Sequence, residues 1–247
     1  SVDETQAALA EASTVAHARR VARQIAPLRG IRGVGGADIT RVLTETWAAG
    51  GVDLDNDADG LRMLFSTAFE DGLVAIGLTA AALPDNPAAA LDLAESWMEM
   101  VDDIQTADAL GWLVLGPALM AVQAPVAEAL GSWREDLIPQ RRAATIAAMA
   151  ALPVPVEGPA AAALRARLGD RRVAFVSDAI DDILVPHLTL WLRDDEPHVR
   201  RATARLLREW ASVSPESAQE VAIAYRGGLP KFLRGALEKG LRKQRRP

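Results

Sequence analysis

Apolar residues recur at helical spacing along almost all of this 247-residue chain, and few stretches alternate as a β-strand does. Alanine, leucine, glutamate and arginine dominate, whereas β-branched runs are short. The chain is therefore expected to be all-α. The spacing predicts helices at about residues 5–26, 38–49, 59–67, 69–83, 87–104, 107–121, 124–137, 139–151, 158–168, 172–185, 186–193, 197–213, 215–226 and 229–244.

Short breaks rich in Pro, Gly or Asn separate most of these helices, for example at 84–87, 153–155 and 227–228. From residue 69 onward, helix pairs recur at roughly 35 to 40 residues, near the period of HEAT-type repeats. Residues 184–202 have the pattern of such a repeat: a short apolar helix is followed by an acidic turn with proline and then by a basic helix start. We expect a single domain, 1–247, built as a HEAT-like α-solenoid of stacked antiparallel helix pairs with a concave face.

The composition excludes several kinds of site. With no cysteine, a disulfide framework, a thiolate zinc site and a cysteine nucleophile are ruled out. The three histidines, His17, His187 and His198, are far apart in sequence, so a catalytic triad has few candidates. No apolar run reaches the roughly 18 residues of a membrane helix, and residues 1–13 lack a signal-peptide pattern. We expect a soluble, cytoplasmic protein.

Charge is unevenly distributed, although the formal net charge is −6. Residues 1–136 hold 8 Lys and Arg against 21 Asp and Glu, whereas residues 137–247 hold 19 against 12, and 16 of these 19 are arginine. A guanidinium group binds phosphate through two parallel hydrogen bonds. The basic second half therefore suggests nucleic-acid contact. For the basic tail at 239–246, the alternative is a solvated helix end.

Three polar runs resemble ligand-binding motifs only in part. In the acidic run at 53–60, a calcium loop would place its bidentate glutamate where Ser66 stands, so a solvated loop is favoured. The glycine-rich run at 30–36 has no preceding strand and is interpreted as a turn between helices. The aspartates at 102–108 resemble the magnesium-diphosphate motif of isoprenoid synthases, but the second cluster at 181–184 lacks a third carboxylate.

The segment 96–103 has a carboxylate next to apolar residues. On the predicted helix, Met98 and Asp102 are four residues apart and share one face, while Trp97 and Val101 share another. A carboxylate beside an apolar wall is what a site that stabilises a positive charge needs. The alternative is a helix with one core face and a row of surface acids.

Five stretches occur in a particular order along the chain. They are residues 30–34 with the helix at 38–47, residues 64–65 with Glu70 and 75–76, residues 97–102, residues 141–144, and residues 207–211 with 215–216. Together, over about residues 16–243, they resemble the HEAT-repeat DNA glycosylases of the bacterial AlkD type, the DNA alkylation repair family. Residues 97–102 are similar to its "W-W-D-x-V-D" and residues 141–144 to its "R-R-x-A".

The resemblance implies an activity. Members of this family remove purines alkylated at N3 or N7, with a carboxylate and flanking indoles stabilising the positive charge while water attacks. By this resemblance Asp102 is the catalytic residue, and no metal or cofactor is required. The resemblance places the family's phosphate-binding arginines at Arg142 and Arg208, with Arg141 as a one-residue alternative to Arg142. We add Arg205 to this predicted DNA-binding set, and we expect Trp97 and Met98 to form the lesion-pocket wall.

Two positions depart from the family pattern: Met98 and Arg205 stand where the family has tryptophans. Each lost cation–π contact is worth about 0.5–2 kcal/mol. Arg205 would also repel a cationic base unless it faces a phosphate or pairs with Asp102. The smaller or more flexible side chains could widen the cleft, which predicts that adducts bulkier than methyl are better substrates.

Two hypotheses about function follow. In the first, the chain is a monomeric repair glycosylase, or a lesion-binding relative, that acts on alkylated bases in duplex DNA and associates with the nucleoid when bound. In the second, it is a non-catalytic HEAT-type scaffold that binds protein or DNA. The acidic first half and the missing indoles motivate the second hypothesis.

Overall fold

A computed structural model describes residues 1–25, 27–122, 130–152, 188–225 and 227–243. The predicted helices at 158–168 and 172–185, and much of that at 124–137, lie outside these ranges. The described elements are α1 (Val2–Glu11), α2 (Val15–Ala22), α3 (Gly36–Ala48), α4 (Ala58–Thr67), α5 (Phe69–Ala82), α6 (Pro87–Met98), α7 (Ile104–Leu110), η1 (Gly111–Leu115), α8 (Gly116–Val122), η2 (Gly131–Glu135), α10 (Pro139–Ala151), α13 (Pro197–Val213), α14 (Pro215–Ala224) and α15 (Lys231–Lys243).

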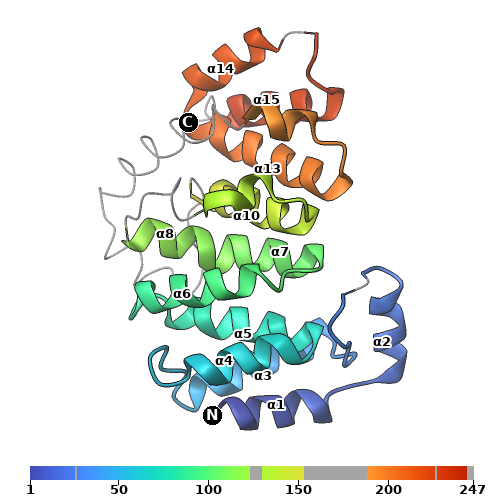
Figure 1. Cartoon of the computed structure of the whole chain (residues 1–247), viewed down its shortest axis with the longest axis vertical. Coiled ribbons are helices and arrows are strands. Elements are labelled where there is room, and N and C mark those ends of the chain that lie inside the picture. The colour runs from blue at the N-terminus through green and yellow to red at the C-terminus, as the bar shows by residue number, and fades with distance from the viewer. Residues whose placement is uncertain (26, 123–129, 153–187, 226, 244–247) are drawn as a thin grey trace.

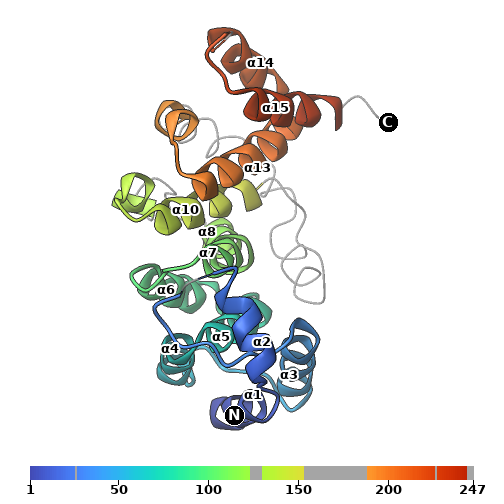
Figure 2. The same ribbon diagram turned by 90° about the vertical axis from the view of Figure 1, so that its right-hand side faces the viewer.

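The helices stack in chain order into an elongated body (Figure 1). One layer contains α3, α5, α7 with η1, α10, α13 and α15, each packed on the next. The helices α4, α6 and α14 pack against this layer as the second members of helix pairs, which Figure 2 shows for α4 and α6. Among the described residues there is no β-strand, only one isolated bridge between Gly30 and Ala68. The prediction of an all-α, solenoid-like fold is confirmed.

The apolar core runs along the interface between the two layers. Its largest fully buried side chains include Trp97, Trp191, Trp210 and Phe65. Helix α10 is buried over nearly its whole length, because alanines at most of its central positions allow helices to approach on several sides. The buried helix α10 therefore holds its neighbours α7 and α13 in place, and the start of α7 belongs to the candidate site.

One continuous helical stretch, Ile104–Val122, joins α7, η1 and α8. By length and composition alone it could cross a membrane, but 61% of its apolar window is buried inside the protein, as in the core helix of a soluble domain. Its middle section, η1, is a π-helix. This stretch lies against α10 and is therefore part of the stack.

Two predicted helices are divided differently in the structure. The helix predicted at 5–26 is broken after Glu11, because Thr14 accepts a hydrogen bond from the His17 N–H and starts α2. The helix predicted at 87–104 ends at Met98, and Asp103 caps the start of α7. Asp102 therefore lies in the turn between α6 and α7 and does not share a helix face with Met98.

Candidate functional site

The segment from Pro27 to Val34, called the strap below, connects α2 to α3 and crosses the start of α5. The carbonyl of Gly30 accepts a hydrogen bond from the Phe69 N–H, at 2.8 Å. Gly33 has a φ of 83°, and a Cβ there would lie 2.1 Å from the carbonyl oxygen of Thr14. Only glycine fits this close passage against α2.

Two fully buried acids at the start of α5 hold the second half of the strap. The carboxylate of Glu70 accepts three successive backbone N–H groups, from Arg32 at 2.9 Å, Gly33 at 2.8 Å and Val34 at 3.2 Å. Asp71 forms a two-point ion pair with Arg32, and this hydrogen-bonded pair raises the pKa of Arg32. The glycine-rich run therefore does form a turn between helices, and its N–H groups bind a carboxylate of the same chain.

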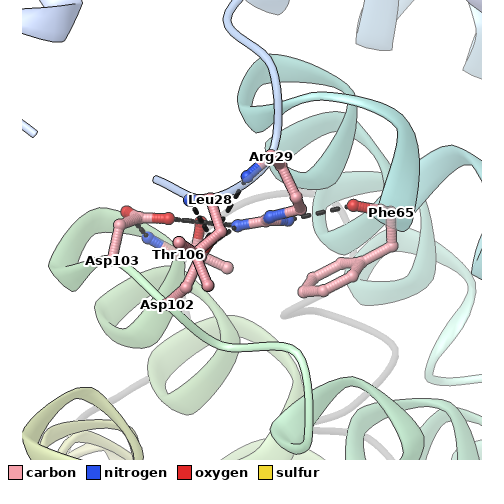
Figure 3. A network of polar contacts seen from close by, with 6 residues as sticks. All are labelled: Leu28, Arg29, Phe65, Asp102, Asp103 and Thr106. Atoms are coloured by element: carbon pink, nitrogen blue, oxygen red, sulfur yellow. Dashed lines mark hydrogen bonds and ion pairs between the residues drawn. The ribbon is translucent and has the colours of Figure 1, made fainter. Parts of the chain in front are cut away.

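Arg29 is the centre of a buried polar network in the first half of the strap (Figure 3). Its Nη2 donates to Asp102 Oδ1 at 3.0 Å, to Asp103 Oδ2 at 3.1 Å and to Thr106 Oγ1 at 3.0 Å. Its Nη1 donates to the carbonyl of Phe65 at 2.9 Å. The side chain is only 8% exposed. The guanidinium is thus bound on both sides, by helix α4 and by the start of α7.

Asp102 receives the backbone of the strap as well as the guanidinium. Its Oδ2 accepts the N–H of Leu28 at 2.5 Å and the N–H of Arg29 at 3.4 Å. The Asp102 side chain keeps 10% of its surface exposed, against 2% for that of Asp103. The predicted catalytic aspartate is therefore present as a nearly buried carboxylate whose charge is already paired.

Asp103 caps the start of α7. As the N-cap of α7 it accepts the Thr106 N–H at 2.8 Å, and its other oxygen accepts the Thr106 hydroxyl. Burial raises the pKa of Asp103, while the hydrogen bonds from Thr106 and the charge of Arg29 act in the opposite direction. Capping explains why the chain turns here, since the side chain satisfies N–H groups that a helix start leaves without partners.

An aromatic face completes the surroundings of the guanidinium. The Arg29 Cζ lies 4.7 Å from the centroid of the Phe65 ring, and Phe65 stacks on Trp97 at 4.7 Å with an interplanar angle of 5°. Trp97 and Met98 are themselves completely buried in the core. They were predicted as a lesion-pocket wall, but neither side chain reaches a surface; the aromatic residue that faces the cation is Phe65.

A cavity of about 500 Å³ opens beside Asp102. Apolar side chains form much of its wall, and it also contains one of the predicted DNA-binding arginines. Its lining residues are Leu28, Arg29, Ser66, Glu99, Met100, Val101, Asp102, Ile138, Gln140 and Arg141. The structure therefore brings Asp102 and Arg141 to one cavity.

Arg141 and Arg142, at the start of α10, pair with acidic side chains of the same chain. Arg141 lies 3.3 Å from carboxylate oxygens of both Glu99 and Asp136 and donates to the Glu99 carbonyl at 2.6 Å. Arg142 does not line the cavity, and it pairs with Asp194 at 2.9 Å. A phosphate would have to compete with these carboxylates for either guanidinium.

The other two predicted DNA-binding arginines lie on α13, which does not line the cavity. Arg208 pairs with Glu209 at 2.7 Å and is 41% exposed. Arg205 stacks on Trp112, with Cζ 3.6 Å from the ring centroid, and makes no hydrogen bond or ion pair with any residue that the structure describes. Burial lowers its pKa, against the attraction of Asp108. Arg205 therefore does not pair with Asp102 or with any other acid that the structure describes. Its N–H donors remain available to bind a phosphate.

Arg29 is the site residue that sequence reasoning missed. A signal existed: the glycine-rich run is flanked by Arg29 and Arg32, and acid pairs stand at 70–71 and 102–103. Charge alone could not tell which acid pair each arginine joins. Among the residues that the structure describes, no group of three or more His, Asp or Glu is placed to hold a metal ion.

Comparison with known proteins identifies the family. A family model described as DNA alkylation repair enzyme matches residues 5–239, which include both the strap and all the predicted site residues. No curated protein matches the chain. Because the match covers nearly the whole chain, the protein belongs to the DNA alkylation repair enzyme family, which assigns it a role in DNA repair.

Proposed function

We propose that the protein is a DNA glycosylase that acts on purines alkylated at N3 or N7 in duplex DNA. The observation that carries this proposal is the cavity beside Asp102, in which a carboxylate borders apolar side chains and the guanidinium of Arg141. Alkylation gives the purine a positive charge, and a carboxylate stabilises both that charge and the sugar cation that develops as the glycosidic bond breaks. Water is the nucleophile, and no cofactor takes part.

The size of the cavity supports a preference among lesions. Met98 lies in the core and Arg205 on Trp112, so neither closes the space next to Asp102. About 500 Å³ lined by Leu28, Val101 and Ile138 exceeds what a methyl group fills. Bulky N3 or N7 adducts are therefore expected to be released faster than methylpurines. Equal or slower release of the bulky adducts contradicts this preference.

The test is base release from methylated duplex DNA. Wild-type protein is expected to release methylpurines, and Asp102→Asn to lose at least about 100-fold in rate, since the carboxylate is the electrostatic catalyst. Asp92→Asn is the matched control because Asp92 is exposed on α6. The proposal is wrong if wild-type protein releases neither methylpurines nor bulky adducts. It is also wrong if the release does not depend on Asp102.

A second candidate function is lesion binding without base removal. The Arg29–Asp102 ion pair favours it, because a carboxylate that is already paired stabilises a second cation less. Binding to alkylated duplex DNA without base release selects this candidate over the glycosylase. Absence of affinity for duplex DNA at low salt, with or without a lesion, leaves only a protein-binding scaffold.

A further inference from the structure

We propose that Arg29 determines which ligands this site accepts, because its guanidinium fills the cation position beside Asp102. A positively charged base must then compete with a cation that belongs to the protein. The inference rests on the proposed function and deepens it: with Arg29 in place the wild-type site prefers a cationic lesion over a neutral one only weakly, and removal of Arg29 strengthens that preference.

The surroundings of Arg29 are those of a cation-binding site. Two carboxylates, Asp102 and Asp103, accept hydrogen bonds from one guanidinium nitrogen, and the ring of Phe65 presents its face to the same group. A carboxylate combined with an aromatic face is the arrangement that stabilises an organic cation in a desolvated site. In this protein the guanidinium of Arg29 itself occupies the cation-binding position (Figure 3).

Arg29 is anchored independently of Asp102. Asp103, Thr106 and the Phe65 carbonyl each hold the guanidinium at 2.9–3.1 Å, and all three belong to α4 or the capped start of α7. A ligand that draws the Asp102 carboxylate into the cavity therefore leaves Arg29 in place. The positive charge of Arg29 then stays near the ligand and weakens the attraction that a cationic ligand feels.

Arg32 provides a matched control within the same strap. It too forms an ion pair, with the fully buried Asp71, and its loss removes an anchor of comparable kind. Arg32 has no contact with Asp102 and does not line the cavity. An effect of loosening the strap will therefore appear with both Arg29→Gln and Arg32→Gln, whereas an effect of charge at the cavity will appear only with Arg29→Gln.

The experiment compares two duplexes of the same sequence that differ by one positive charge. One contains a pyrrolidine abasic analogue, which is cationic, and the other contains the neutral tetrahydrofuran analogue. The measured quantity is the affinity for the cationic duplex divided by the affinity for the neutral duplex. We expect Arg29→Gln to raise this ratio about tenfold or more over wild type. Arg29→Lys and Arg32→Gln are expected to leave it unchanged, and Asp102→Asn to remove any preference.

Two other outcomes separate failure of this inference from failure of the proposed function. If Arg29→Gln binds the neutral duplex as wild type does but shows an unchanged or smaller ratio, Arg29 serves to position Asp102 and the inference is wrong. If wild type binds neither duplex, the proposed function fails instead.

A second measurement tests the cation position without DNA. In Arg29→Ala, methylguanidinium is expected to raise the melting temperature at concentrations at which it does not stabilise wild type, and ammonium to have no such effect. No stabilisation of Arg29→Ala by methylguanidinium counts against the inference.

Discussion

Asp108 is a half-buried acid of α7 that is attracted by the charges of Arg205 and His198 on α13. Burial raises its pKa, and the charges of Arg205 and His198 offset part of that effect. A carboxyl group whose pKa is higher in the folded protein than in the unfolded chain favours folding when protonated. That contribution is fully present below its unfolded pKa and is lost as the pH rises through the folded value.

Asp108→Asn is therefore expected to stabilise the protein at pH 7, because it removes the cost of an ionised group in this place. The gain in melting temperature should shrink as the pH falls toward 4, where Asp108 itself is increasingly protonated. Thermal unfolding at several pH values checks this. Asp92→Asn, at an exposed position of α6, should change little at any pH. A gain that is equally large in acid contradicts the explanation.

Glu70 satisfies three backbone N–H groups of the strap, and this requires both of its oxygens. Glu70→Gln replaces one oxygen by an amide nitrogen, which points a donor at the Arg32 N–H. The expected cost is about 2–3 kcal/mol of unfolding free energy, measured by urea denaturation, since a buried donor loses its partner. Glu45→Gln is the control, because Glu45 lies on the exposed side of α3, and a loss there as large as that from Glu70→Gln would contradict the argument.

The residues of the site differ in how far the sequence could reveal them. Asp102 was predicted from a motif of neighbouring residues, and it lines the cavity. The partner of Asp102 is 73 positions away in a loop with no periodic pattern, so no local rule connects the two. Trp97 and Met98 were assigned to a wall by the family resemblance and because the helix was expected to continue to Asp102. Asp103 caps a new helix, so the expected helix does not extend to Asp102.

At the scale of the helices, the π-helix η1 brings two glycines against α10. The N–H of Gly116 donates to the carbonyl of Gly111, an i to i+5 bond that places both residues on one side. A Cβ on Gly111 would lie 2.4 Å from the Ala144 carbonyl oxygen, and one on Gly116 2.5 Å from that of Ala148. The two backbones are in direct contact along this edge.

Gly111→Ala should therefore destabilise the protein by about 2–4 kcal/mol, since the helices must move apart in a close-packed core. Gly235→Ala is the matched control: Gly235 lies in α15 with nothing within 4 Å of the added methyl. Alanine has the higher helix propensity, so this variant should gain up to about 1 kcal/mol. Chemical denaturation of both variants gives the comparison. If the two changes have the same sign, close contact at Gly111 is not what matters.

Periodicity predicted the helices well where tertiary contacts agree with local preference, as in α10 and α13, whose observed bounds, Pro139–Ala151 and Pro197–Val213, equal the predicted ones. It failed where a side chain starts a new helix. Thr14 and Asp103 both do so by accepting an N–H three residues ahead. The π-helix was not predicted, because it depends on the approach of α10 and not on the apolar pattern of its own residues.

For the molecule as a whole, acidic and basic residues concentrate in different halves of the chain. Three of the four predicted phosphate-binding arginines pair with acids of the same chain. Few of them are therefore free to neutralise DNA phosphates and so release counterions. Arg205 is the exception among the four, with a stacked guanidinium that keeps its hydrogen-bond donors. DNA affinity is therefore expected to depend strongly on this residue.

Arg205→Gln should weaken binding to duplex DNA and reduce the dependence of log affinity on log salt concentration by about one. Arg62→Gln should leave that slope unchanged, because Arg62 lies on α4 in the acidic half and pairs with Asp59. Fluorescence anisotropy with one duplex across a range of salt concentrations measures both slopes. An equal slope for wild type and Arg205→Gln shows that Arg205 does not bind phosphate.

The strap sets a limit on the modularity of this fold. A solenoid whose repeats touch only their neighbours can lose a terminal repeat and keep the rest. Here one segment near the front satisfies acids of two successive helix pairs, Glu70 and Asp71 on α5 and Asp102 and Asp103 before α7. A fragment that begins at α3 would leave these four acids without the donors that the strap supplies. Shortening from the front should thus abolish folding of repeats that the deleted residues do not adjoin in sequence.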